Sequence, residues 1–365
     1  MRKIFAVVLT IFIFSGVSAA QNRIGLDRID AMIRPSAIGD LPRFLMEQAA
    51  GTEVKNIKPW AWWGGIDPFP PTAQKPREEN GYWVVPGIRM EGWHRYKFEE
   101  LDRVMNAAKM YNLSVALAIH GPPKWPRGDD VCEYDFGTYH PCGVIKQSHF
   151  EIFRNALFDF AYYLALRYPD VKYFIAYNEP NLPYAFLPEK PYPGGTLLNA
   201  YIELAYWPIS DGVRATGREV YVVGPEITLL NVENEFGKSR WLEDWIEPML
   251  EYYPNLFDVV GVHNYAVDAN QTLEKTEKLR KVFEKFPHAT QRIWLTEYNF
   301  GTQKESLTRT DMHIFSQLAI LYSNQWWERS YLFTMMDSLI FTDEANFGQR
   351  KPLYDLFKLL VQHFN

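Results

Sequence analysis

The sequence predicts a single (β/α)8 TIM barrel of the α/β class, in which each of eight parallel strands is followed by a helix. Short apolar runs alternate with helical patterns from about residue 54 onward, which is typical of repeated β–α–β units. The runs FDVVGV and YVVG are continuously apolar, as strands buried on both faces of a sheet are. An open doubly wound sheet is the alternative, but no G-x-G-x-x-G loop supports its nucleotide-binding form.

The expected strands are short apolar runs that end in polar or aromatic residues. Seven of them cover residues 54–62, 113–120, 171–178, 220–225, 257–264, 292–297 and 331–336. An eighth, the first of the barrel, is expected within residues 23–33, where the apolar pattern is weakest. Eight strands of this kind would close a barrel.

Between the strands, apolar residues recur every three or four positions, which is the spacing of a helix with one buried face. This spacing is regular at Phe98, Leu101, Val104, Met105 and Ala108. The expected helices cover residues 41–48, 98–111, 148–168, 197–215, 241–250, 273–286, 308–325 and 352–363. Neither a linker nor a short-period repeat interrupts this order, so one domain is the simplest interpretation.

The first 20 residues, MRKIFAVVLTIFIFSGVSAA, have the pattern of a secretory signal peptide. Arg2 and Lys3 precede an apolar stretch that reaches about Phe14 and is short for a membrane span. A retained N-terminal anchor is the alternative. With cleavage near Ala19 or Ala20, residues 21–365 would form the barrel domain of a secreted or periplasmic protein with no membrane span.

The charge balance argues against nucleic acid and anionic membranes as partners. The formal net charge is −6, and without Arg2 and Lys3 it would be −8, from 36 basic and 44 acidic residues. Both kinds of partner need clustered Lys and Arg, whereas residues 275–285 alternate Lys with Glu and are typical of a solvated helix face. Export favours a disulfide between the two cysteines, Cys132 and Cys142, and no nearby His pair suggests zinc.

Polar and aromatic side chains collect where the expected strands end, which in a (β/α)8 barrel is the active-site face. They are Trp60, Trp62 and Trp63 on the second strand, His120 with the nearby Trp125 on the third, Asn178 and Glu179 on the fourth, His263, Asn264 and Tyr265 on the sixth, and Glu297 on the seventh. Two carboxyl groups at such positions suit glycoside hydrolysis, where one protonates the leaving oxygen and the other attacks the anomeric carbon or activates water.

A family resemblance rests on these two strand ends. The segment YNEPNL, residues 177–182, resembles the N-E-P signature of clan A glycoside hydrolases, and LTEYN, residues 295–299, resembles the T-E signature of their nucleophile strand. Together with VKYFIAY and FDVVGVHNY, these segments look most like family 39 and related family 5-like exopolysaccharide hydrolases. The matches cover roughly residues 54–360 and imply a retaining double displacement.

The resemblance implies a role for each matching residue. Glu179 would be the general acid/base and Glu297 the nucleophile, with their carboxyl groups about 5–5.5 Å apart. Asn178 would hydrogen-bond the sugar 2-hydroxyl. Tyr265 would hold Glu297 by its hydroxyl group, and His263 would line the same wall.

Further residues are expected to contact the substrate. His120 is in position to reach a sugar hydroxyl, although a structural histidine is the alternative. Trp60, Trp62 and Trp125 are expected to form stacking platforms, with core packing as the alternative. Lys58 stands where the clan usually carries an Arg that contacts the nucleophile, and it supplies the charge without the bidentate fork.

The sequence therefore predicts an exported, monomeric retaining glycosidase that acts on a polysaccharide or oligosaccharide without cofactor or metal. An endo-acting enzyme is favoured, because tryptophans at the strand ends suggest an open cleft. An exo-acting β-glycosidase or a transglycosylase is the rival in mechanism. A glycan-binding protein without turnover is the rival from another class, and the two glutamates argue against it.

Overall fold

The computed structural model describes thirteen stretches of the chain and two single residues. These are residues 24–27, 40–66, 77–79, 82–85, 88–91, 98–123, 125–127, 144–182, 186, 188–234, 237–266, 269–298, 326–332, 350 and 352–364. The predicted signal peptide, the predicted helix at 308–325 and both cysteines lie outside the described residues. Within the described ranges, no helix has the length and apolar content needed to cross a membrane.

Parallel strands form the barrel. Its eight strand positions are occupied by β1 (Ile24–Asp27), β2 with β3 (Asn56–Lys58 and Trp60–Trp62), β7 (Ser114–His120), β8 (Tyr173–Ala176), β9 with β10 (Tyr221–Val223 and Ile227–Thr228), β13 (Val260–His263), β14 (Ile293–Tyr298) and β15 (Arg329–Leu332). Strand β1 confirms the strand expected within residues 23–33. It pairs with β15 on one side and β2 on the other.

The barrel closes at its fifth strand position, which is split into β9 and β10. The hydrogen-bonded order of the strands begins at β10 and ends at β9, and these two segments follow each other in the sequence. Val223 at the end of β9 bridges to Val259, and the Gly224 N–H donates to the carbonyl of Val259 at 3.0 Å. The ladder therefore passes from β9 to the β13 side without an open edge between them.

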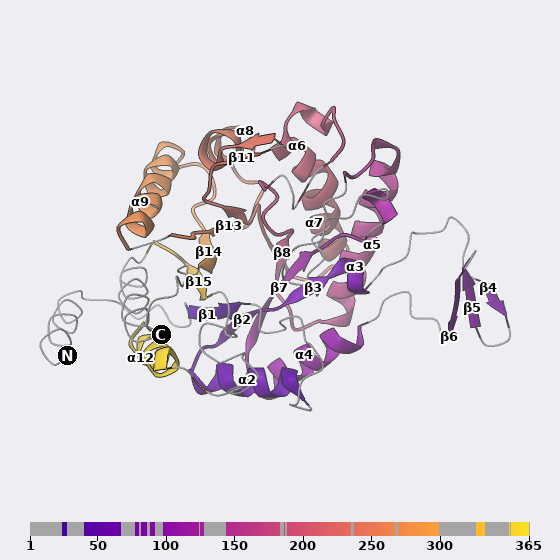
Figure 1. Ribbon diagram of the computed structural model, residues 1–365, viewed down its shortest axis with the longest axis horizontal. Helices are drawn as coiled ribbons and strands as arrows, with labels where there is room; N and C mark the ends of the chain where they lie inside the picture. Colours follow the sequence, from indigo (N-terminus) through magenta and orange to yellow (C-terminus); the bar gives the residue numbers. More distant parts are fainter. Residues whose placement is uncertain are drawn as a thin grey trace, which may run out of the picture.

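Helices surround the strands in a ring (Figure 1). They are α2 (Leu41–Gly51), α3 (Trp63–Ile66), α4 (Glu99–Met110), α5 (Phe150–Arg167), α6 (Leu197–Tyr201), α7 (Trp207–Arg214), α8 (Glu247–Tyr252), α9 (Ala269–Lys285) and α12 (Pro352–Phe364). Short 3-10 turns lie at Trp125–Arg127, Gln147–His149 and Pro193–Gly195.

Two predicted helices, 197–215 and 241–250, contain a π-helical segment. These segments are η4 (Ile202–Tyr206) and η5 (Trp241–Ile246), and each precedes an α-helix with a proline at its second position. Proline has no N–H to donate, and its ring collides with the carbonyl four residues earlier in a regular α-helix. A wider π turn before Pro208 and Pro248 gives the backbone room for the ring.

The core has two parts. One cluster of buried residues packs between the strands and the helices. A smaller one fills the inside of the barrel, as side chains of alternating strands do in this fold; it consists of Trp60, Ala116, Ala118, Ile175, Val223, Val259, Trp294 and Tyr331. This packing leaves the polar strand ends as the place for chemistry.

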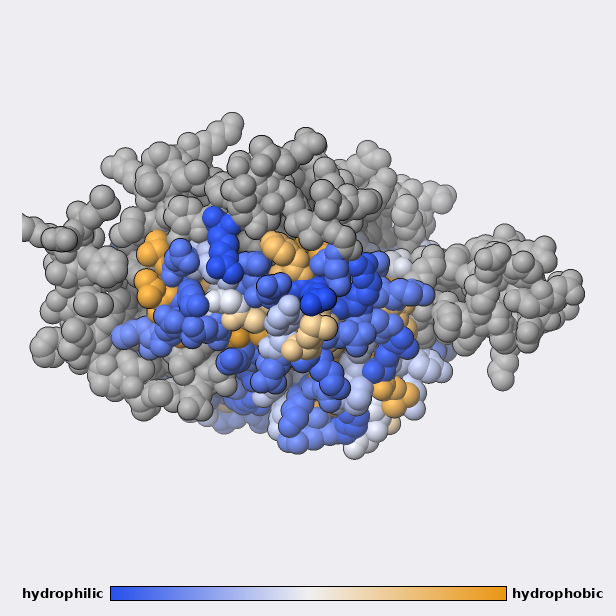
Figure 2. Space-filling model, turned by 90° about the horizontal axis from the view of Figure 1, so that it is seen from below, coloured by the Kyte–Doolittle hydropathy of each residue, from blue (hydrophilic) through white to orange (hydrophobic). Residues whose placement is uncertain are grey.

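Two small antiparallel sheets accompany the barrel. One contains β4 (Arg77–Glu79), β5 (Tyr82–Val85) and β6 (Ile88–Glu91), and it stands to the right of the barrel in Figure 1. The other pairs β11 (Val232–Asn234) with β12 (Gly237–Ser239). On the face of the molecule that Figure 2 shows, the coloured surface is mostly hydrophilic, with hydrophobic side chains in small separate groups.

Candidate active site

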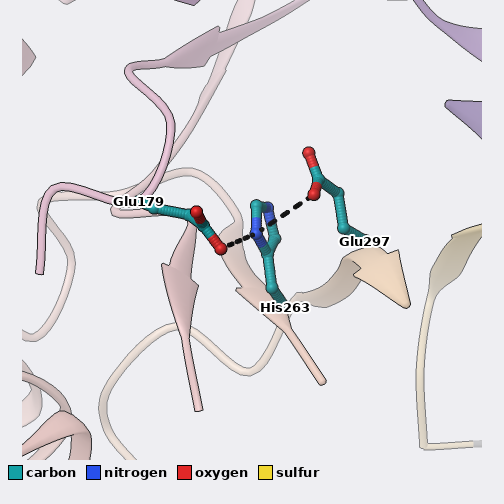
Figure 3. A group of neighbouring side chains, drawn as sticks. All are labelled: Glu179, His263 and Glu297. Carbon is teal, nitrogen blue, oxygen red and sulfur yellow. Dashed lines mark hydrogen bonds and ion pairs between the residues drawn. The ribbon is translucent and has the colours of Figure 1, made fainter. Parts of the chain in front are cut away.

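Three side chains from the ends of three barrel strands converge at one end of the barrel (Figure 3). Glu179 follows β8, His263 ends β13, and Glu297 lies near the end of β14. A carboxylate oxygen of each glutamate and a ring nitrogen of His263 all lie within 4.8 Å of one another, so the two carboxylates are close neighbours. The fold thus brings together two glutamates that are far apart in the sequence.

His263 lies between the two glutamates. Its Nδ1 is 2.9 Å from Oε1 of Glu179 and 3.4 Å from Oε2 of Glu297. The imidazole is fully buried. Burial alone would lower the pKa of His263, but the charge of Glu297 and the contacts with Glu179 and Glu226 raise it from 6.5 to about 10. At neutral pH the ring is therefore an imidazolium with a proton on each nitrogen.

Lys58 and Glu226 form a fully buried ion pair beneath this group. Lys58 Nζ donates to Oε1 of Glu226 at 2.7 Å and to Oε1 of Glu297 at 2.9 Å. It also donates to the carbonyl of Thr296 at 3.2 Å. Glu226 Oε1 lies 3.4 Å from His263 Nε2. Lys58 thus contacts the expected nucleophile, as the resemblance implied for its position, and its ammonium lies in the protein interior.

Tyr265 fixes the second oxygen of Glu297. Its hydroxyl group donates to Glu297 Oε2 at 2.5 Å, a short charge-assisted hydrogen bond. The backbone carbonyl of Tyr265 accepts a bond from Lys275 Nζ at 2.7 Å, which ties the segment after β13 to α9. Lys275 is half-buried, so the expectation of a solvated helix face is wrong for this residue.

Backbone conformation is unusual at three residues of the site. Tyr177, Glu179 and Glu226 have φ values of 71°, 47° and 33°, in the left-handed region that non-glycine residues seldom adopt. Such residues cost on the order of 1–3 kcal/mol each and persist where the surrounding structure fixes them. Glu179 is held in part by its N–H, which donates to the carbonyl of Glu226 at 3.0 Å.

His120 at the end of β7 and the tryptophans of the adjoining β3 form an aromatic group. The His120 ring meets Trp60, Trp62 and Tyr177 edge to face, with ring centroids 4.9, 5.7 and 5.4 Å apart. Gly121 follows with φ +70°, and a Cβ there would stand 2.9 Å from the Trp62 ring. Glycine at this position therefore lets Trp62 pack against the chain.

The other expected site residues lie in different surroundings. Asn178 is buried, and among the described residues its Oδ1 has no hydrogen-bond partner, so it has an acceptor to offer. Trp125 is half-buried with its ring against His149, 6.3 Å between centroids, and within the described residues its Nε1 has no hydrogen bond to either glutamate. Trp63 is buried against Phe153 and Phe160, so it belongs to the core.

Glu179, His263 and Glu297 are also the donor types that bind a divalent metal. An imidazolium offers no free nitrogen lone pair, and Lys58 already places a positive charge against Glu297. The arrangement therefore suits a proton-transfer and carboxylate chemistry better than metal binding at neutral pH.

Glu226 is the site residue that sequence reasoning missed. The predicted strand 220–225 ends at Pro225, one residue before Glu226. The signal was present, because VVGPE has the same form as IAYNE on the preceding strand: an apolar run that ends on a glutamate. A carboxylate immediately after a buried strand was informative in both places.

Comparison with known protein families finds a matching family model. A model described as the glycosyl hydrolase catalytic core matches residues 155–350, which span β8 to β15 and include Glu179, Glu226, His263 and Glu297. Comparison with curated protein sequences found no significant match.

Comparison with solved structures gives neighbours of low sequence identity. A monomeric β-xylosidase from Caulobacter crescentus CB15 has a TM-score of 0.61 at 17% identity, over 92% of this chain and 66% of that one. A family 39 (GH39) β-xylosidase from Caulobacter crescentus has a TM-score of 0.61 at 16% identity, over 95% of this chain and 73% of that one. An endo-β-1,4-glucanase from Xanthomonas axonopodis pv. citri has 0.50 at 12%, over 94% and 99%. These likenesses support the barrel fold.

Proposed function

Because the chain belongs to the glycosyl hydrolase catalytic core family, we propose that it is an exported retaining glycosidase that cleaves a polysaccharide by double displacement. The observation that carries the proposal is the placement of Glu179 and Glu297, with carboxylate oxygens within 4.8 Å of each other. Retaining glycosidases hold their two carboxyl groups about 5–5.5 Å apart, and inverting ones about 6.5–9.5 Å apart.

In the first step, an oxygen of Glu297 attacks the anomeric carbon while Glu179 gives its proton to the departing glycosidic oxygen. The products are a glycosyl ester on Glu297 and a Glu179 carboxylate. In the second step, Glu179 takes a proton from water, whose oxygen attacks the anomeric carbon and releases Glu297. Glu297 suits the attacking role because Lys58 and Tyr265 hold both of its oxygens.

Several neighbours are proposed to bind the sugar. Asn178 precedes Glu179, its Oδ1 has no hydrogen-bond partner among the described residues, and it would meet the 2-hydroxyl, as the resemblance implies. His120, with Trp60 and Trp62 around it, would contact the ring and hydroxyl groups of the sugar at or next to the cleavage point. Trp125 remains a candidate for a more distant subsite.

The cleavage pattern is a finer proposal. Likeness to an endo-β-1,4-glucanase and the tryptophans at the end of β3 favour internal cleavage of a polymer. Likeness to β-xylosidases favours an exo-acting β-glycosidase or a related transglycosylase instead. Product masses from a panel of polysaccharides separate these cases, since internal cleavage gives a ladder of oligosaccharides from the first minutes.

The same panel, with the anomeric configuration of the first product followed by NMR, tests the proposal as a whole. The expected result is release of reducing sugar with the β- or α-configuration of the substrate retained. An inverted first product would contradict the double displacement. Tight glycan binding without any released sugar would favour a binding protein over an enzyme.

We also propose where the protein acts and that it is a monomer. The signal-peptide pattern of residues 1–20 supports export to the periplasm or the medium. The monomeric neighbour and the mostly hydrophilic coloured part of the surface in Figure 2 support a monomer. Secretion of the full chain and the mass of the mature protein in solution check both.

A further inference from the structure

We propose that Glu226 is a positioning residue that keeps Lys58 and His263 positively charged, so that the site stays electrically balanced while negative charge moves between Glu297 and Glu179. The proposal rests on the retaining mechanism proposed above. Glu226 touches neither reacting atom. It acts through the two cations that contact the reacting carboxylates.

Glu226 lies behind both cations. Its Oε1 accepts from Lys58 Nζ at 2.7 Å and lies 3.4 Å from His263 Nε2, and its side chain is fully buried. Lys58 in turn bonds Glu297, and His263 bonds Glu179. One carboxylate is thus linked, through one cation each, to both members of the catalytic pair.

The other described groups near Glu226 do not supply this charge. Tyr201 of α6 is fully buried, burial raises its pKa well above the ordinary value, and its hydroxyl group donates to the carbonyl of Ala176 at 2.6 Å. It is therefore neutral. The Glu179 N–H meets the backbone carbonyl of Glu226 and not its carboxylate. Lys58 and His263 are the charged side chains that face Glu226 in the described part of the chain.

Counting charges gives the same total at each stage of the reaction. In the resting enzyme, Glu226 and Glu297 balance Lys58 and His263 while Glu179 holds a proton. In the glycosyl-enzyme, Glu297 is a neutral ester and Glu179 is a carboxylate, so the total is again zero. His263 Nδ1 lies within reach of both carboxylates, at 2.9 and 3.4 Å, and can donate to whichever one is charged.

Without Glu226, the two buried cations would face a single carboxylate in the resting enzyme. An uncompensated buried charge is costly, and the most favourable relief is loss of the extra proton from His263. That loss removes electrostatic support that the first step requires. The active form would then survive only to a lower pH than in the natural protein.

The pH dependence of kcat/KM in Glu226→Gln tests this. The substitution keeps the shape of the side chain and removes its charge. The alkaline limb of the profile should move to lower pH by about 1–3 units, the usual effect of one close charge. Thr52→Val is the control, because Thr52 is equally buried and its hydroxyl group donates to the carbonyl of Ala49 at the end of α2, away from both cations. Its limb should stay in place. A Glu226→Gln profile that is lower but not displaced would overturn the proposal.

A second measurement does not depend on turnover. In ¹⁵N-histidine NMR spectra at pH 8, His263 should appear as an imidazolium in the natural protein and as neutral imidazole in Glu226→Gln; substitution of His263 assigns the signal. A neutral His263 in the natural protein, or a His263 signal unchanged by Glu226→Gln, overturns the proposal, and the natural-protein spectrum decides even if the variant fails to fold. Absence of glycoside cleavage with the NMR change present would instead contradict the proposed function alone.

Discussion

The hydroxyl group of Tyr265 lies 2.5 Å from Oε2 of Glu297 and donates its hydrogen to it. A hydrogen bond to a charged group contributes about 1.5–3 kcal/mol, and here it orients the carboxylate that we propose as the nucleophile.

Tyr265→Phe should therefore lower kcat/KM by about 10- to 100-fold, because 1.36 kcal/mol corresponds to a factor of ten in rate. Steady-state kinetics on an aryl glycoside measure the change. Tyr206→Phe is the control, since the Tyr206 hydroxyl bonds the carbonyl of Leu256 away from the site, and it should keep the natural rate. Equal losses in both variants would mean that the Tyr265 effect is one of general packing.

The roles of the two glutamates can be separated with azide. Glu297→Gly should lose turnover below detection and recover it on addition of azide, which replaces the missing nucleophile. Glu179→Gln should lose about 10²–10⁴-fold on substrates with poor leaving groups and far less on activated ones, since general acid catalysis contributes that much. Azide should not restore the activity of Glu179→Gln on substrates with poor leaving groups. Rescue of both variants, or of neither, would contradict the assignment.

Removal of the Lys58 charge should destabilise the fold, because the buried carboxylates of Glu226 and Glu297 would each lose an ion pair. Lys58→Met should lower the free energy of unfolding by about 3–5 kcal/mol, measured by urea denaturation. Adding Glu226→Gln should recover part of this loss, because one negative charge is removed with the positive one. Lys109→Met removes the exposed pair with Asp170 and should change stability little.

Stability should also depend on pH through His263. The pKa of its ring is raised from 6.5 to about 10 in the folded protein, so its stabilising contribution is complete below pH 6.5 and is lost as pH rises toward 10. The free energy of unfolding should fall over that window, by at most about 1.4 kcal/mol per pH unit for one proton. Urea denaturation at pH 7, 8 and 9 gives the slope. His263→Gln should have a shallower one, and an unchanged slope would count against a charged His263.

The contact between Gly121 and Trp62 can be tested with a pair of alanine substitutions. Both Gly121 and Gly217 have positive φ, +70° and +71°, but only at Gly121 would a Cβ meet another side chain, at 2.9 Å from Trp62. Gly217→Ala should lower stability by about 1–2 kcal/mol for the backbone conformation alone. Gly121→Ala should cost more and should raise KM if Trp62 binds the sugar. Equal effects would show that Trp62 yields freely.

The barrel and its main glutamates were predictable because both depend on local sequence. Apolar runs buried on two faces define the strands, and Glu179 and Glu297 each follow such a run directly. The contacts of Lys58 were harder to predict, because its partner Glu226 is 168 positions away and meets it only across the closed barrel. The surroundings of Trp62 and Trp63 also differ in a way that the sequence does not show. β3 ends at Trp62 and α3 begins at Trp63, and this change of backbone turns the Trp63 ring into the core.

The ion pairs of Lys58 have a consequence for how the chain folds. They join β2 to residues 168 and 239 positions further along, so an early half of the barrel holds an ammonium with neither of its carboxylates. A partly assembled barrel must leave this amine in water, and only the whole ring of strands can enclose it. Completion of the barrel and assembly of the catalytic group should therefore be a single cooperative event, with loss of activity and loss of tertiary structure following one denaturation curve.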